Sequence, residues 1–188
     1  MSINLTGSPQ PTLVDWSSGE ISGEGIEESV KTLGQLAGLF HDERAWSSLN
    51  PQTEVYRVRF WRPVPDGTIG GLFWGSTVLQ PGRVGDEYFM THGHFHLIRD
   101  RAEFYATVKG NGVMLFMDEE GGTWSQMMAP GTVHYIPGGI AHRAINTGDG
   151  PLIFLACWPS DAGHDYARIS ATGFGKRMVM RGGAPCLI

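Results

Sequence analysis

Short segments of alternating polar and apolar residues, separated by turn residues, recur along most of the chain. Residues 54–61 (Glu-Val-Tyr-Arg-Val-Arg-Phe-Trp) show the alternation typical of a strand with one face toward water. Further strands are expected at residues 72–79, 104–108, 113–117, 123–128, 132–136 and 152–158, with Pro-Gly, Asn-Gly or Gly-Gly turns between them. Together with a strand that leads from Tyr88 into the histidines at 92–96, this makes eight or nine short strands at near-regular spacing, which predict an all-β barrel or sandwich.

The N-terminal quarter has a different pattern. Residues 1–21 are polar and show no period, so we expect an extended arm. Between Gly25 and Phe40 apolar residues recur every three or four positions, and Glu27 and Glu28 suit the first turn of a helix. One helix is therefore predicted here, packed by its apolar stripe against the barrel or a partner subunit.

Length and composition limit the remaining possibilities. A chain of 188 residues can bury one core, so we expect one domain with three parts: an N-terminal arm and helix (1–50), a barrel (51–166) and a C-terminal tail (167–188). A net charge of −5 argues against binding to nucleic acid or to anionic membranes. Two cysteines without a CxxC pair, and no long apolar stretch, predict a soluble protein of the reducing cytoplasm.

Four residues form a candidate metal site. In a strand His94 and His96 face the same side, while Phe95 faces the opposite side. Glu103 lies a hairpin's length further on, and His142 follows a turn from which it can approach on a neighbouring strand. Three imidazoles and one carboxylate suit Fe(II), Mn(II), Ni(II) or Zn(II).

The coordination geometry would decide what such a site does. On an octahedral ion, four protein ligands leave two open positions, which a substrate with adjacent oxygens can occupy. On tetrahedral zinc the same four ligands close the shell, and the site would be structural. The other histidines considered, His41 and His134, lack this context and are assigned to the surface and to a structural role.

The spacing of these residues resembles the two motifs of the cupin superfamily. His94-Phe95-His96, Glu103 and Gly110 match the first motif, and the segment 131–146, which contains His142, matches the second. The flanks at 91–96, 100–103 and 161–166 resemble the cupin-type (archaeal-type) phosphoglucose isomerases over about residues 50–175. This resemblance implies a double-stranded, jelly-roll-like β-helix barrel.

The same resemblance carries expectations about function. It implies a homodimeric, metal-dependent isomerase that interconverts glucose 6-phosphate and fructose 6-phosphate in glycolysis and gluconeogenesis, with an iron-type divalent ion. The ligands would be His94, His96, Glu103 and His142. The residues expected to line the pocket for the sugar and its phosphate are Thr77, Thr91, Gly93, Tyr105, His164 and Tyr166.

Three positions depart from the family pattern. Gly139 and Trp158 stand where members often have tyrosine, and His92 stands where they tend to have lysine. Loss of two hydroxyls and a fixed charge would alter substrate choice or rate, while all four expected ligands remain.

The mechanism and two other functions stay open at this point. Glu103 is the candidate base for proton transfer between C1 and C2, but a ligated carboxylate is a poor base, so a metal-assisted hydride shift is the alternative. An Fe or Mn cupin oxidase or dioxygenase would use the same ligands. A phosphosugar-binding cupin without catalysis would use the same pocket.

Overall fold

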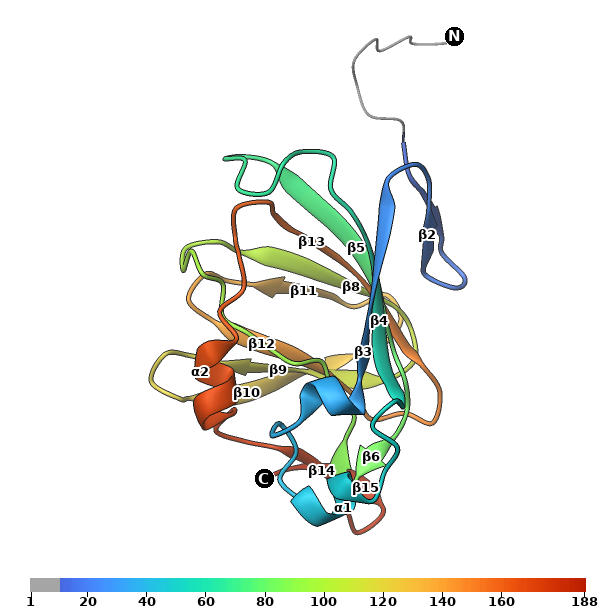
Figure 1. Ribbon diagram of the computed structural model, residues 1–188, viewed down its shortest axis with the longest axis vertical. Helices are drawn as coiled ribbons and strands as arrows, with labels where there is room; N and C mark the ends of the chain where they lie inside the picture. The colour runs from blue at the N-terminus through green and yellow to red at the C-terminus, as the bar shows by residue number, and fades with distance from the viewer. Residues whose placement is uncertain (1–10) are drawn as a thin grey trace, which may run out of the picture.

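The computed structural model describes residues 11–188 and shows a barrel of two sheets with short additions at both ends (Figure 1). All strand pairs of both sheets are antiparallel. The larger sheet has the order β11 (Val133–Ile136), β8 (Glu103–Lys109), β13 (Leu152–Pro159), β5 (Leu72–Leu79), β4 (Glu54–Trp61) and β3 (Ile26–Thr32). The smaller sheet has the order β10 (Thr123–Met128), β9 (Gly112–Met117) and β12 (Ala141–Asn146).

Apolar side chains from both sheets meet in one core. Val55, Leu79 and Phe154 of the larger sheet and Phe116 and Ile145 of the smaller sheet belong to a single buried cluster. Burial of such side chains is the main favourable contribution to folding. The predicted all-β barrel is confirmed.

The helix predicted between Gly25 and Phe40 is wrong. Ile26–Thr32 forms β3, which pairs with β4 and exchanges ion pairs with it, including Glu28 with Arg57 at 2.7 Å. A 3-10 turn, η1 (Leu33–Leu36), then buries its first and last leucines. The three-residue spacing of the apolar residues comes from this turn. The conformation of the preceding residues 26–32 is decided by their pairing with the long neighbouring strand β4.

Two shorter elements were also missed at the N-terminal end. Residues 11–21 of the predicted arm are not simply extended, because β1 (Leu13–Asp15) and β2 (Glu20–Ser22) form a hairpin; the rest of that arm lies outside the described residues. Helix α1 (Glu43–Ser47) begins where the side chain of Asp42 accepts a hydrogen bond from the Ala45 amide at 2.8 Å.

The C-terminal residues form structure of their own. Helix α2 (Ala167–Thr172) is followed by β14 (Met178–Arg181) and β15 (Ala184–Leu187), which join β7 (Glu87–Tyr88) and β6 (Arg83–Val84) in a small sheet (Figure 1). Ile169, Phe174 and Met178 extend the barrel core from this end. The three-part division stays a prediction, and β3 pairs with β4 across its expected boundary at residue 50.

The segment that carries His94 and His96 is extended but not a regular strand, which corrects the predicted strand there. His94 forms an isolated bridge with His142, and Phe95 forms one with Asp165. These bridges tie the segment to β12 on one side and to the residues after β13 on the other. Within residues 11–188 no helix is long and apolar enough to cross a membrane.

Candidate metal centre and adjoining cavity

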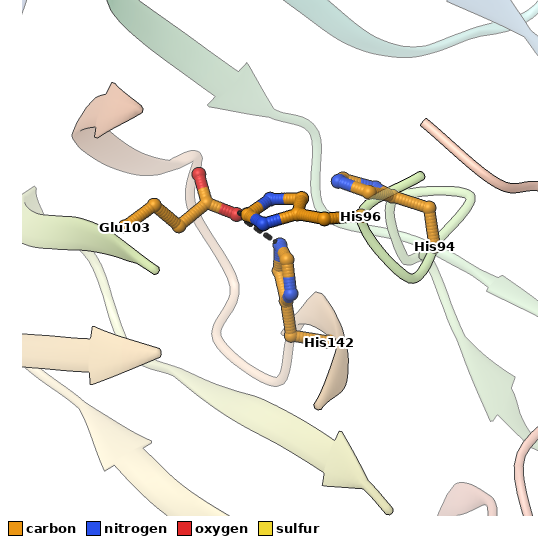
Figure 2. Close-up of side chains that lie close together, drawn as sticks. All are labelled: His94, His96, Glu103 and His142. Carbon is orange, nitrogen blue, oxygen red and sulfur yellow. Dashed lines mark hydrogen bonds and ion pairs between the residues drawn. The ribbon is translucent and has the colours of Figure 1, made fainter. Parts of the chain in front are cut away.

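Four side chains from three parts of the fold lie close together (Figure 2). His94 and His96 come from the extended segment, Glu103 begins β8, and His142 lies on β12. One potential ligand atom of each lies within 4.8 Å of those of the others. His96, Glu103 and His142 are buried, and the Nε2 atom of His94 is buried without a hydrogen-bond partner.

The backbone holds these segments together. The amide of His94 donates to the carbonyl of His142 at 3.3 Å, and the amide of His142 donates to the carbonyl of His94 at 3.1 Å. The two imidazoles are therefore adjacent although 48 residues separate them in the sequence. Phe95 between the two histidines faces the opposite way and is fully buried, as the alternation predicted.

The hydrogen bonds of two rings identify the nitrogen that faces Glu103. Nδ1 of His96 lies 2.7 Å from the carbonyl of Arg101, and Nδ1 of His142 lies 3.4 Å from the carbonyl of Ile140. A carbonyl only accepts hydrogen bonds, so both Nδ1 atoms must donate. In the neutral rings Nε2 then carries a lone pair, and both Nε2 atoms point at the carboxylate.

The distances show that a positive charge is needed among these atoms. Oε1 of Glu103 lies 3.0 Å from Nε2 of His96 and 2.5 Å from Nε2 of His142 (Figure 2). The second approach lacks hydrogen-bond geometry, since this Nε2 has no hydrogen-bond partner. Lone pairs facing a carboxylate repel it unless protons or a cation lie between them. A divalent cation meets this need, and the mixed N and O donors suit a first-row transition metal.

The pKa shifts of His94 and Glu103 agree with a site that can hold a cation. Burial lowers the pKa of His94 well below its usual value, and the nearby His142 lowers it further, so His94 offers a lone pair at neutral pH. Burial raises the pKa of Glu103, but the neighbouring His142 and His96 outweigh this effect and lower the pKa overall. The carboxylate is therefore ionised, and the cluster could hold a divalent metal.

A cavity of about 120 Å³ opens beside the cluster. It is lined by Thr77, Thr91, Gly93, Tyr105, His164 and Tyr166, which are all six of the expected substrate-pocket residues, and by His94, Glu103 and His142. His96 lies behind this wall and does not line the cavity. Tyr166 is 42% exposed and marks the open end of the cavity.

Gly93 shows why one lining residue has no side chain. Its φ angle is +77°, and a Cβ atom there would lie 2.8 Å from Nε of Arg143 and 2.9 Å from the ring of Phe174. The positive φ angle and the lack of space both favour glycine here. Thr91 is fixed nearby, because its hydroxyl accepts a hydrogen bond from the Ala144 amide at 3.1 Å.

Other lining residues were not predicted. Tyr56 and Val58 on β4, Gly75 on β5, and Phe154 and Ala156 on β13 also line the cavity. Tyr56 and Val58 share one face of the first predicted strand, so alternation could identify that face but could not show what it faces.

The three departures from the family pattern lie in different places. His92 and Trp158 line the cavity, whereas Gly139 does not. The ring of His92 lies 4.7 Å from that of Tyr166, and its Nε2 lies 3.3 Å from the hydroxyl of Ser170 on α2. Burial lowers the pKa of His92, and the charges of Arg143 and Lys31 lower it further, so this residue does not replace a fixed cation at neutral pH.

The matching family model and the most similar relatives belong to one family. The family model described as glucose-6-phosphate isomerase matches residues 30–187. Glucose-6-phosphate isomerase of Pyrococcus furiosus is 44% identical over 170 residues, which cover 90% of this chain and 89% of that protein. The enzyme of the same name from Pyrococcus horikoshii is 43% identical over 175 residues and covers 93% of this chain and 92% of that protein. Among solved structures, oxalate decarboxylase from Bacillus subtilis at pH 4.6 superimposes with a TM-score of 0.46 and 20% identity, over 64% of this chain and 29% of that chain.

Proposed function

The chain belongs to the glucose-6-phosphate isomerase family, and we propose that it interconverts glucose 6-phosphate and fructose 6-phosphate with a bound divalent metal ion. The observation that carries the proposal is the convergence of three histidines and one carboxylate at the end of a cavity lined by hydroxyl groups. The sugar would enter this cavity with its C1 and C2 oxygens toward the metal centre.

The proposed ligands are His94, His96, Glu103 and His142, with Fe(II) as the first choice of metal and Mn(II), Ni(II) or Zn(II) as the others. A bound ion would act as a Lewis acid that stabilises the negative charge developing on O1 and O2. The carbonyls of Arg101 and Ile140 orient the two rings that face Glu103, and such partners tune ligand strength.

The remaining polar residues of the cavity would position the sugar phosphate. Thr77, Thr91 and the backbone at Gly93 offer hydroxyl and amide donors. His164 and Tyr166 stack on each other with ring centroids 5.5 Å apart and border the open end. Tyr105 lies further in, where its ring stacks on Phe154 at 4.9 Å.

Two routes for the hydrogen transfer are compatible with these residues. In the first, Glu103 removes the proton from C2 and returns it to C1, which requires the carboxylate to be free at that moment. In the second, a hydride passes directly between the two carbons.

Three wider properties belong to the same proposal. The partner in solution would be a second copy of the chain, and the exposed Phe104, Val133 and Tyr135 on neighbouring β8 and β11 supply an apolar patch of the kind that marks an interface. The phosphosugar is the only other partner proposed. The free Cys157 and Cys186 suit the reducing cytoplasm.

An anaerobic coupled assay tests the reaction directly. The protein loaded with Fe(II) or Mn(II) should convert fructose 6-phosphate to glucose 6-phosphate without oxygen, at a rate that the presence of oxygen does not raise. Oxygen uptake with some other substrate and no interconversion would indicate an oxidase or dioxygenase instead. Binding of the phosphosugar without interconversion would indicate a binding protein.

A further inference from the structure

A second cavity lies on the other side of the loop that carries His92 and Gly93. It has a volume of about 170 Å³, well above the roughly 10–15 Å³ that one water molecule needs. Its wall combines Arg143 of β12, Ser170 and Thr172 of α2, and Phe174, Lys176 and Arg177 from the segment before β14. It shares no lining residue with the cavity at the metal centre.

Arg143 is the unusual member of this wall. It is only 4% exposed, and it forms no ion pair among the described residues. Its Nη2 donates to the carbonyl of His92 at 2.5 Å, and its guanidinium lies 4.3 Å from the ring centre of Phe174. Its Nη1 donates to the sulfur of Met90 at 2.9 Å, and its Nε, which lies beside Gly93, is buried without a hydrogen-bond partner. Arginine keeps its charge in proteins, and a buried charge is normally paired with an opposite charge.

The other charged residues around the cavity add to the unpaired positive charge of Arg143. Arg177 is paired with Glu87, with Nη1 and Oε1 2.9 Å apart, so that pair is close to neutral. Lys176 lines the cavity, is exposed to solvent and forms no ion pair among residues 11–188. The C-terminal end of the short helix α2 carries about half a negative elementary charge, which repels an anion. The two full positive charges of Arg143 and Lys176 outweigh this repulsion.

We propose that this cavity is a second anion site, which binds a small oxyanion such as inorganic phosphate or the phosphate group of a monoester. Arg143 would supply the buried charge and Lys176 the charge at the entrance. Charge-assisted hydrogen bonds from arginine and lysine are the usual means of holding such groups.

The position of Arg143 links this site to the catalytic cavity. Its Nε lies close to Gly93, and its Nη2 donates a hydrogen bond to the carbonyl of His92. The loop that faces the substrate therefore packs against this guanidinium. An anion in the second cavity would neutralise the charge behind that loop. Binding at the two sites would therefore be coupled, and each anion would weaken the other reciprocally.

Calorimetric titration with inorganic phosphate tests the site on the full, metal-loaded chain. The change is Lys176→Glu, which reverses the charge at the entrance without touching the core. The matched control is Lys109→Glu, which makes the same change at an exposed end of β8 that lines neither cavity. We expect wild type and the control to bind one more phosphate per chain than Lys176→Glu, or to bind it at least tenfold more tightly.

Equal stoichiometry and equal affinity in all three proteins would overturn the proposal. A second variant, Arg143→Gln, should lose the same phosphate while circular dichroism shows a folded barrel, and retention of that phosphate would also overturn it. Titration with methyl phosphate distinguishes the two sources of the anion. Tighter binding of inorganic phosphate would identify the free ion as the ligand, and tighter binding of methyl phosphate would identify a monoester. None of these measurements depends on isomerase activity.

Discussion

At the scale of single residues, two backbone carbonyls determine which ring nitrogens of the candidate metal centre are free to bind a metal. Arg101 and Ile140 accept hydrogen bonds from Nδ1 of His96 and His142, and this leaves Nε2 of each ring to face Glu103. The lone pairs and the carboxylate then face a common point, where a divalent metal could be held. Removal of one ring should therefore affect the ion before it affects the barrel.

The first prediction concerns His142→Ala. We expect metal content and activity to fall together, with a loss of activity at least as large as the roughly 10–100-fold that removal of an outer partner costs. The matched control is His134→Ala, because His134 is also buried but bonds to Thr132 and Gln126 outside the cluster. Full metal occupancy in His142→Ala, measured by elemental analysis, would remove His142 from the ligand set.

The second prediction concerns the hydroxyl of Tyr105. Burial raises the pKa of Tyr105 well above its usual value, and the charge of Glu103 raises it further, so the group stays protonated and can only donate to a developing negative charge. Tyr105→Phe keeps the ring stacked on Phe154 and should lower kcat by about 100-fold, as loss of one such donor does. Metal content should not change.

Steady-state kinetics on Tyr105→Phe give the answer when compared with Tyr135→Phe. Tyr135 lies on β11 and is 56% exposed, outside the cavity, so its variant should keep the wild-type rate. An unchanged kcat in Tyr105→Phe would show that the hydroxyl takes no part in the reaction.

Residue types and their spacing in the sequence predict much of this centre. The spacing of His94, His96, Glu103 and His142 was sufficient to single out the four side chains that converge. The contributions of Tyr56 and Phe154 to the cavity could not be predicted, because they depend on which strands become neighbours. The role of Arg143 behind the loop depends on burial, which spacing alone does not reveal.

At the scale of elements, ion pairs hold the segments that carry the site. Arg101 binds Asp161 through two contacts, with Nε and Oδ1 2.9 Å apart and Nη2 and Oδ2 2.7 Å apart. This bidentate pair joins the turn before Glu103 to the segment that carries His164 and Tyr166. The metal centre and the open end of the cavity are thereby held in a fixed relation.

The third prediction tests this connection with Asp161→Asn. We expect the midpoint of thermal unfolding to fall by about 2–4 °C at pH 7 and KM to rise as the segment loosens. The matched control is Asp100→Asn, since Asp100 pairs with the same arginine but its side chain is 77% exposed, where ion pairs contribute little.

The effect of Asp161→Asn on the melting temperature should depend on pH. Hydrogen bonds from Arg101 lower the pKa of Asp161 below the ordinary value of 3.8. A lowered pKa in the folded state stabilises the protein above pH 3.8, and this stabilisation is lost as the pH falls through the lower folded value. The difference in melting temperature between wild type and Asp161→Asn should therefore persist from pH 7 to pH 5 and disappear in stronger acid. A constant difference at all pH values would contradict this assignment.

The strands were easier to predict than the segments around them. Residues 72–79 and 123–128 form strands with the predicted bounds, because alternation and turn residues are local signals. Residues 26–32 contain spacings that fit both a helix and a strand, and only the long-range pairing with β4 decides between them. The hairpin β14–β15 is stabilised by its packing on the core and on β7, which no local pattern indicates.

At the scale of the whole molecule, the outer face of the larger sheet carries the next prediction. Phe104 and Tyr135 lie opposite each other on β8 and β11 with ring centroids 5.3 Å apart, and both are more than half exposed. We expect light scattering to give about twice the chain mass of 20.5 kDa. Tyr135→Glu should shift the protein toward the single-chain mass, because a charge in an apolar interface is costly. A single-chain mass for wild type would contradict the proposed dimer.

The converging histidines and Glu103 are proposed to act by holding a metal ion that the isomerase reaction requires. The most direct test removes the metal with a chelator and returns Fe(II) or Mn(II) in known amounts during a coupled glucose 6-phosphate assay. We expect the stripped protein to be inactive and the rate to rise in proportion to added metal until one ion is bound per chain. Full interconversion by protein in which elemental analysis detects no metal would contradict the claim.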